Sequence, residues 1–314
     1  MAADAGAAPL RADVLAGLSA RPRHLPTQYL YDARGSALFE AITRQPEYYP
    51  TRVELALLAA HMPRIADAVG ANVHVVEYGS GSGLKTEQLL AGLQAPLAYT
   101  PVEISPAALE ACVARLRPRF PQVAMLPLCA DFTRPLRLPR PLRTPARTLV
   151  FFPGSTLGNF SDDQAVALMQ AMAATLGAHG RALIGIDLVK DVALVEAAYN
   201  DAAGVTAEFT LNILARINRE LGADFDLGGF AHQARYVEQH ERIETHLVSL
   251  HRQRVRVAGR SFDFAAGDTI QVEYSHKYRD ERFAALAARA GLEVVDGWGG
   301  VAEGFGLRLL RRSG

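Results

Sequence analysis

Three glycines stand at alternate positions in residues 77–85, which read EYGSGSGLK. Gly79, Gly81 and Gly83 follow a short apolar run and precede a segment with helical spacing. Glycine lets the backbone turn sharply and approach a ligand closely, and the first N–H groups of a helix are free to bind that ligand. The sequence therefore predicts a ligand-binding loop between a strand and a helix, with a plain tight turn as the alternative.

The spacing of these glycines favours one cofactor over another. Dinucleotide enzymes use G-x-G-x-x-G, in which the third glycine comes one residue later. The spacing G-x-G-x-G, preceded by the acid Glu77, is typical of class I methyltransferases that bind S-adenosylmethionine. Glu103 ends the next apolar run, where a carboxylate can accept both ribose hydroxyls. Asp131 and Phe132 follow the third run, where they could bind adenine, although a helix cap and a core aromatic are the alternatives.

Apolar runs alternate with amphipathic segments through the same region. Five runs are predicted as strands, at residues 73–78, 98–104, 123–128, 148–154 and 182–188. Helical spacing appears between them, as in KTEQLLAGL and PAALEACVARL. Near-continuous hydrophobicity suits strands that are covered on both faces. We therefore expect an α/β fold built on a Rossmann-like, doubly wound sheet of mostly parallel strands.

This alternation breaks after the fifth run. The chain is predicted to be mainly helical from residue 189 to about residue 250, with strand-like segments in RIETHLVSLHRQRVRV and TIQVEYSHKY. A helix near residues 281–290 and two last apolar runs resemble the closing helix and hairpin of the sheet. We therefore predict a second, smaller lobe of mixed α+β structure. The expected domains are 54–188 with 278–314 for the cofactor, and 1–53 with 189–277 for the substrate.

Composition disfavours several kinds of partner. The chain has 314 residues, of which 49% are hydrophobic and 21% charged, as in an ordinary soluble globular protein. Its 33 basic residues balance its 33 acidic ones, so a nucleic acid or an anionic membrane is disfavoured as the main partner. The N-terminal residues lack a signal-peptide pattern, and no apolar run approaches the roughly 20 residues of a membrane span. We expect a cytoplasmic monomer that acts on a small molecule.

The thiols and imidazoles predict no metal site. Cys112 and Cys129 lie in apolar surroundings without metal-like spacing, which disfavours both a disulfide framework and a cysteine-based zinc site. The nine histidines also lack compact metal spacing. His240, His246 and His251 come closest, and we expect them to be surface or packing residues.

Longer segments carry a more specific resemblance, which spans nearly the whole chain. YLYDARGSALFEAITRQPEYYPTR at residues 29–52, FPGSTLGNF at 152–160 and LIGIDLVKD at 183–191 resemble the histidine Nα-methyltransferases of ergothioneine biosynthesis. AYNDAAGVTAEF and NRELGADFD add to the resemblance. It implies a class I methyltransferase with a substrate-binding second domain. It also implies successive transfer of methyl groups from S-adenosylmethionine to the α-amino nitrogen of histidine, giving the betaine hercynine.

The same resemblance implies roles for individual residues. The implied cofactor-binding residues are Gly79, Gly81, Gly83, Lys85, Glu103, Asp131 and Phe132. The implied catalytic residues are Tyr31, near the meeting point of donor and acceptor, with Asn159 and Tyr199, which hold the head group of the amino acid. The implied residues around the imidazole are Tyr48, Glu273 and Ser275. An amide and a phenol can fix a carboxylate, and a carboxylate can accept from an imidazole N–H.

Simpler interpretations of these residues stay open at this point. Tyr48 and Tyr199 could be ordinary interfacial tyrosines, and Asn159 could cap the helix that begins near residue 162. Glu273 alternates with its neighbours along a predicted strand, so it could be a solvent-facing carboxylate.

One residue departs from the family pattern. In RIETHLVS, relatives usually carry Met at the position occupied here by Thr245. If Thr245 lines the acceptor pocket, a short hydroxyl-bearing side chain makes that pocket larger and more polar. The retained Glu273 and Ser275 favour an imidazole acceptor, whereas Thr245 puts histidine selectivity in question.

Two alternatives therefore stand beside histidine methylation. The first is an N-methyltransferase of the same fold that acts on tryptophan, a histidine derivative or another small amine. The second is a catalytically silent regulatory protein that binds S-adenosylmethionine. The glycine spacing disfavours a dehydrogenase, and the neutral charge disfavours a nucleic-acid methyltransferase.

Overall fold

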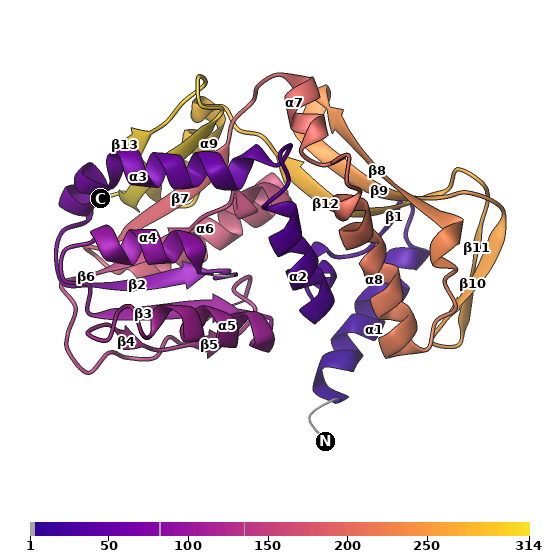
Figure 1. The fold of residues 1–314 in the computed structure, drawn as a ribbon, viewed down its shortest axis with the longest axis horizontal. Coiled ribbons are helices and arrows are strands. Elements are labelled where there is room, and N and C mark those ends of the chain that lie inside the picture. Colours follow the sequence, from indigo (N-terminus) through magenta and orange to yellow (C-terminus); the bar gives the residue numbers. More distant parts are fainter. Residues whose placement is uncertain (1–3, 82, 135) are drawn as a thin grey trace. The chain divides into compact units, whose positions relative to one another are not determined.

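The chain divides into two compact units in the computed structural model, which describes residues 4–81, 83–134 and 136–314 (Figure 1). Unit 1 comprises Met1–Tyr48 and Asp191–Ser275, and unit 2 comprises Tyr49–Lys190 and His276–Gly314. The boundaries differ by a few residues from the expected 54–188 and 278–314. Unit 2 is longer because helix α3 begins at Tyr49 and because Lys190 and Lys277 bind Asp187 within this unit.

Unit 2 contains an 8-stranded sheet in the order β13-β14-β7-β6-β2-β3-β4, with β5 also pairing with β3. The strands are β2 (Val73–Tyr78), β3 (Ala98–Glu103), β4 (Ala124–Met125), β5 (Leu128–Cys129), β6 (Arg147–Phe152), β7 (Arg181–Asp187), β13 (Leu292–Trp298) and β14 (Phe305–Arg312). Strands β2 to β7 pair in parallel, whereas β14 is antiparallel to both β7 and β13. This topology confirms the predicted doubly wound sheet with a closing hairpin.

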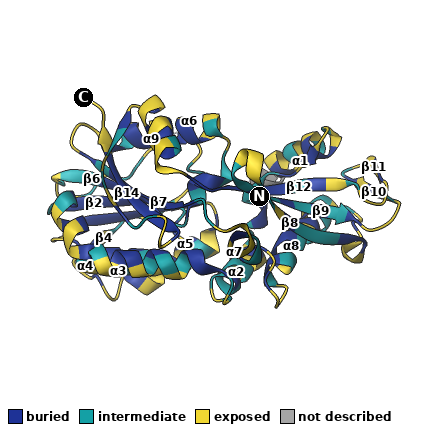
Figure 2. Cartoon of the chain, turned by 90° about the horizontal axis from the view of Figure 1, so that it is seen from above, coloured by how far each residue is buried: buried dark blue, intermediate teal, exposed yellow. Residues whose placement is uncertain are grey.

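Helices cover both faces of this sheet. They are α3 (Tyr49–Val69), α4 (Leu84–Gly92), α5 (Pro106–Leu116), α6 (Asp162–Leu176) and α9 (Asp280–Arg289). Phe151 packs in one core with α3, α4 and α5, while the next residue, Phe152, packs in a second core with α6 and α9. Figure 2 accordingly shows β2, β7 and β14 buried for most of their length. Burial on two faces explains why these strands are almost continuously apolar.

Unit 1 combines a second sheet with helices. Its sheet has the order β1-β12-β9-β8, and β10 and β11 form a separate antiparallel pair. The strands are β1 (Arg23–His24), β8 (Phe230–Val237), β9 (Arg242–Ser249), β10 (Gln253–Val257), β11 (Arg260–Phe264) and β12 (Thr269–His276). The helices are α1 (Asp4–Ser19), α2 (Ala33–Ile42), α7 (Val192–Ala197) and α8 (Val205–Leu221). Short 3-10 turns are η1 (Thr27–Leu30), η3 (Leu227–Gly229) and η4 (Glu238–His240), with η2 (Thr156–Asn159) in unit 2.

Two expectations about individual elements were wrong. The run at residues 123–128 is two short strands, β4 and β5, because Pro127 between them cannot donate a ladder hydrogen bond. Helical structure does not continue to about residue 250. Helix α8 ends at Leu221, where Gly222 takes up a left-handed conformation, and β8 then begins at Phe230.

Helix α3, with 21 residues, is the longest in the described part of the chain. It carries charged residues at several positions, among them Glu54 and Arg64. No helix of the described residues is both long and apolar enough to cross a membrane.

Candidate active site

The predicted glycine loop joins β2 to α4 in unit 2. Gly79 and Gly83 have φ angles of 78° and 72°, a region that favours glycine. The N–H of Gly79 donates to the carbonyl of Val102 on β3, at 2.9 Å. A Cβ at Gly83 would lie 2.8 Å from Sγ of the buried Cys112, closer than atoms can pack. The loop therefore needs glycine both for its backbone conformation and for its fit against α5.

Glu103 lies against this loop, at the end of β3. Its Oε2 accepts from the N–H of Gly81 at 3.3 Å, and its Oε1 accepts from the N–H of Ser105 at 3.1 Å. The residue is 9% exposed. Each oxygen of a carboxylate can accept more than one hydrogen bond, so both keep capacity for a hydroxyl of a ligand.

Phe132 and Asp131 lie close to the same loop but differ in surroundings. The Phe132 ring stacks on Tyr78, with 5.8 Å between centroids, and a Cβ at Gly79 would lie 3.5 Å from its edge. Asp131 Oδ1 accepts from the N–H and the hydroxyl of Thr133, at 2.9 and 2.6 Å. Phe132 thus borders the loop, whereas the carboxylate of Asp131 stabilises its own turn, and its contact with adenine stays a prediction.

Lys85 is paired with an acid that the sequence analysis did not single out. Its Nζ lies 2.5 Å from Oε2 of Glu54, a side chain that is 0% exposed. Both oxygens of Glu54 also accept from the N–H of Gly154, at 3.0 and 2.9 Å. Helix α3, the first turn of α4 and the segment after β6 therefore meet at one buried carboxylate.

The remaining predicted residue of unit 2, Asn159, is the last residue of η2. This turn follows β6, so Asn159 lies beyond the same carboxyl edge of the sheet that carries Gly79 and Glu103. The capping interpretation of Asn159 is wrong, because Ser161 caps α6 and forms a capping box with Gln164. In open α/β sheets, ligands bind beyond the carboxyl ends of the strands.

Two buried acids beneath this edge have shifted pKa values. Burial raises the pKa of Glu77 to about 8, although hydrogen bonds from Thr86, at 2.5 Å, and from Tyr99 oppose the shift. Burial alone would also raise the pKa of Asp187, but the charges of Lys277 and Lys190 outweigh it and lower that pKa. Environment therefore keeps Glu77 largely protonated and Asp187 ionised near neutral pH.

Asp187 holds three residues at the points where the chain leaves unit 2. Tyr49 donates to both of its oxygens, at 3.0 and 2.8 Å, and Nζ of Lys277 lies 2.8 Å from Oδ2. Lys190 forms a further ion pair with Oδ1. Burial lowers the pKa of Lys190 to about 8, against the opposing charge of Asp187.

No group of three or more possible metal ligands occurs among the described residues.

Three of the predicted substrate residues and the predicted catalytic residue Tyr31 are connected within unit 1. The rings of Tyr48 and Tyr199 lie 6.5 Å apart, and the Tyr199 phenol hydrogen-bonds to Oγ of Ser275 at 2.6 Å. Phe39 links Tyr48 to Tyr31, with centroid distances of 6.2 and 5.7 Å. These residues come from α2, its flanks, the segment that follows α7, and β12, so unit 1 brings distant segments together.

Phe39 and Phe209 belong to this group but were not predicted from the sequence. Phe209 on α8 lies 5.4 Å from Tyr31 and 6.0 Å from Phe39, measured between ring centroids. A phenylalanine in an amphipathic helix looks like any core residue, so only the three-dimensional arrangement distinguishes these two.

Glu273 and Thr245 are both buried in the sheet of unit 1. Glu273 is 9% exposed, so the solvent-facing interpretation is wrong, and it shares a face of β12 with Ser275. Thr245 is 0% exposed, and its Oγ1 has no hydrogen-bond partner in the part of the chain that the structure describes. Thr245 pairs with Ala234 and lies on the same face as His232, whose Nε2 donates to the carbonyl of Tyr199 at 2.8 Å.

The fold and the glycine-loop geometry together define a class of protein. A mostly parallel, doubly wound sheet with this loop, and with a buried acid at the end of the adjacent strand, is the architecture of class I methyltransferases. The chain matches the family described as "Histidine-specific methyltransferase, SAM-dependent" over residues 10–312, and it belongs to that family. The predicted family and its cofactor, S-adenosylmethionine, are confirmed by this match.

Individual relatives agree with the family match. The chain is 42% identical to "Histidine N-alpha-methyltransferase" of Mycolicibacterium smegmatis, covering 99% of this chain and 98% of that protein. It is 40% identical to the protein of the same name from Mycobacterium tuberculosis, covering 98% and 96%. It is also 32% identical to "Ergothioneine biosynthesis protein 1" of Neurospora crassa, covering 93% of this chain and 33% of that protein.

Proposed function

We propose that this enzyme transfers methyl groups from S-adenosylmethionine successively to the α-amino nitrogen of L-histidine, giving hercynine. The observation that carries the proposal is the connected group of Tyr31, Tyr48, Tyr199 and Ser275 in unit 1. The family resemblance alone implies roles for these residues, and they are far apart in sequence. The names of the full-length relatives support histidine as the acceptor.

The residues around the glycine loop fit the cofactor. Glu103 is buried beside the loop, and its oxygens can accept the two ribose hydroxyls. The edge of Phe132 borders Gly79, where an adenine ring could stack on it, and Asp131 would accept from the adenine amino group. When bound, S-adenosylmethionine supplies an activated methyl group. Gly81, Gly83 and Lys85 complete the proposed cofactor set, with Lys85 held by Glu54.

The amino acid substrate is assigned to the polar residues described above. Tyr199 and Asn159 would hold the head group, while Tyr48, Glu273, Ser275 and Thr245 would surround the side chain. Tyr31 is assigned to the position nearest the reacting nitrogen. An ammonium group has no lone pair, so each transfer requires loss of a proton, through Tyr31 or water. Alignment of donor and acceptor is the main contribution of the protein to such a reaction.

A second candidate function is methylation of a different small amine, such as a histidine derivative. The observation that favours it is Thr245, whose buried hydroxyl has no partner among the described residues. Such a group is costly unless a ligand or water satisfies it. An acceptor with one more polar group than histidine would be able to do so.

The decisive experiment is an acceptor panel. The full-length protein is incubated with S-adenosylmethionine and each free amino acid in turn, and products are identified by mass spectrometry. We expect histidine to gain one, two and then three methyl groups. A product from another amino acid, with none from histidine, would reject the proposal. Binding of S-adenosylmethionine without turnover of any acceptor would instead indicate a regulatory protein.

We also propose that the enzyme works as a cytoplasmic monomer, without nucleic acid. Equal numbers of acidic and basic residues and the two free cysteines, Cys112 and Cys129, support this assignment. Light scattering of the purified protein measures its mass in solution directly.

A further inference from the structure

Tyr31 occupies a single position between two helical segments of unit 1. It follows Leu30, the last residue of η1, and precedes Asp32, the N-cap of α2. The turn is tight, since a Cβ at Gly35 would lie only 1.7 Å from the carbonyl oxygen of Leu30. The direction of the Tyr31 side chain therefore depends on how the chain is held on either side of it.

Asp32 is held by three donors. Its Oδ1 accepts from the N–H of Gly35 at 2.7 Å and from Nδ2 of Asn212 at 2.8 Å. Its Oδ2 accepts from Nη2 of Arg219 at 2.7 Å. Burial alone would raise the pKa of Asp32, but the hydrogen bonds from Gly35 and Arg219 outweigh it and lower that pKa. The carboxylate is thus both the cap of α2 and its attachment to α8.

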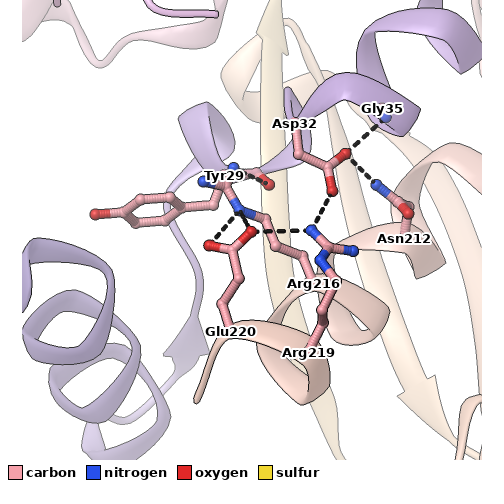
Figure 3. Close-up of polar contacts among 7 residues, drawn as sticks. All are labelled: Tyr29, Asp32, Gly35, Asn212, Arg216, Arg219 and Glu220. Carbon is pink, nitrogen blue, oxygen red and sulfur yellow. Dashed lines mark hydrogen bonds and ion pairs between the residues drawn. The ribbon is translucent and has the colours of Figure 1, made fainter. Parts of the chain in front are cut away.

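The segment before Tyr31 is attached to the same helix through Tyr29, two residues earlier. Nη1 of Arg216 donates to the carbonyl of Tyr29 at 3.1 Å, and the guanidinium lies 5.5 Å from the centre of the Tyr29 ring. Glu220 bridges the two arginines, at 3.1 Å from Nε of Arg216 and 2.9 Å from Nη2 of Arg219. Figure 3 shows Arg216, Arg219 and Glu220 reaching from α8 to the segment that carries Tyr29 and Asp32.

The spacing along α8 explains how one helix can do this. Phe209, Asn212, Arg216 and Arg219 recur every three or four residues and so lie along one face of the helix. Phe209 contacts the ring of Tyr31, while Asn212 and Arg219 bind Asp32 after it, and Arg216 binds the carbonyl of Tyr29 before it. Asp32, Asn212, Arg216, Arg219, Glu220 and Tyr29 are called the Asp32 network below.

We propose that Asp32 is a positioning residue for methyl transfer, which acts by fixing Tyr31 through the Asp32 network. The inference rests on the proposed function, in which Tyr31 lies nearest the reacting nitrogen. Asp32 itself need not touch substrate. Its role is to keep the turn between η1 and α2 in one conformation, since small displacements of an aligning group reduce a rate strongly.

The test uses a double-mutant cycle in the full-length protein. Asp32→Asn keeps the oxygen that caps α2 but places an amide N–H₂ opposite Arg219, so the cap remains and the ion pair is lost. We expect kcat for histidine to fall about tenfold, with cofactor affinity unchanged within about twofold. In a Tyr31→Phe background, the same Asp32→Asn change should have little further effect on kcat, because the Tyr31 phenol through which Asp32 acts is already absent.

Two further variants separate positioning from general damage. Arg219→Gln removes the same ion pair from an exposed side chain of α8, and it should lower kcat in the same direction as Asp32→Asn. Glu208→Gln breaks an exposed 2.6 Å ion pair with Arg34, which also joins α8 to α2 but is not part of the Asp32 network, and kcat should not change.

The outcomes distinguish this inference from the proposed function. A wild-type protein that methylates histidine, with unchanged kcat in Asp32→Asn and Arg219→Gln, would overturn the role of Asp32 alone. An equal loss of kcat with and without Tyr31→Phe would overturn it too, since Asp32 would then act independently of Tyr31. A wild-type protein that does not methylate histidine would overturn both. Thermal melting of each variant shows whether a loss reflects unfolding.

Discussion

The phenol of Tyr199 and the hydroxyl of Ser275 hydrogen-bond to each other in unit 1, with 2.6 Å between their oxygens. Tyr199 follows α7, whereas Ser275 lies near the end of β12. The other end of Tyr199 is also held, because its carbonyl accepts from Nε2 of His232 at 2.8 Å. Burial lowers the pKa of His232, which keeps its ring neutral near neutral pH. The phenol is therefore placed before any substrate arrives.

Because the two hydroxyls are paired, their substitutions should not be additive. Tyr199→Phe and Ser275→Ala are each expected to weaken histidine binding, and the double variant should lose about 1 kcal/mol less than the sum of the two. Calorimetric titration with histidine measures this coupling. Ser261→Ala, at an exposed position of β11, serves as the control. Strict additivity would show that the pair does not act as a unit in binding.

Glu103 provides a test of the cofactor site. Glu103→Ala removes a charged acceptor next to Gly81, so affinity for S-adenosylmethionine should fall by about 1.5 to 3 kcal/mol, or roughly 10-fold to 150-fold. Glu110→Ala, an exposed acid of α5, should leave affinity unchanged. Undiminished affinity of the Glu103 variant would refute its assignment to the ribose.

Local patterns made part of this molecule predictable. Strand β2 was predicted with its observed bounds, Val73–Tyr78, and Gly79 and Gly83 have the positive φ angles for which glycine is needed. The order strand, glycine loop, helix lies within a short stretch of chain, where periodicity is informative. Strand β8 was missed because its alternation is imperfect and no apolar run marks it.

Residues whose roles depend on distant partners were not predictable. Glu54 lies in RVELALL and looks like the polar face of an amphipathic helix, yet it is fully buried because Gly154 and Lys85 donate to it. Lys277 is 0% exposed for a similar reason, since Asp187 compensates its charge. The signal that could have pointed to Glu54 is Lys85, because a partly buried lysine beside a glycine loop needs an acidic partner.

Asp187 should dominate the acid stability of unit 2. Asp187→Asn leaves Lys277 and Lys190 without the carboxylate that binds both, so the free energy of unfolding should fall by about 3 to 5 kcal/mol. The pKa of Asp187 is lowered in the folded protein, so its contribution is present above the unfolded value of about 3.9 and is lost as pH falls below it. Urea unfolding measured from pH 7 to pH 3 checks both expectations.

The control for this prediction is an exposed ion pair of the same unit. Asp163 is 90% exposed and pairs with Arg289 at 2.7 Å, so Asp163→Asn should cost less than about 1 kcal/mol. Equal costs for the two substitutions would contradict the importance given to Asp187.

Glu77 predicts the opposite dependence on pH. Its pKa is raised from 4.5 to about 8, so the folded state holds a proton that the unfolded state releases above about pH 4.5. Stability from this group is complete below that pH and is lost as pH rises towards 8, by at most roughly 1.4 kcal/mol per pH unit. Glu77→Gln should remove this dependence while keeping an acceptor for Thr86 and Tyr99. The measurement is the free energy of unfolding as a function of pH. The same slope in the wild type, in Glu77→Gln and in the exposed control Glu281→Gln would contradict the prediction.

The last prediction concerns the choice of acceptor. Glu273 and Ser275 lie on one face of β12, and both are buried. An imidazole has two ring nitrogens and can satisfy both groups, whereas an indole has one donor and would leave a buried partner unpaired. That mismatch costs about 1 to 3 kcal/mol, so histidine should be preferred over tryptophan by roughly tenfold or more in kcat/KM.

Two variants and a competition assay test this choice. Glu273→Ala should reduce histidine turnover far more than cofactor binding, because unit 1 carries Glu273 and unit 2 carries the glycine loop. Thr245→Met should tighten histidine selectivity without reversing the choice. The assay lets histidine and tryptophan compete for the wild-type enzyme, and mass spectrometry quantifies the methylated products. A preference for tryptophan would reject histidine as the acceptor while leaving the methyltransferase assignment intact.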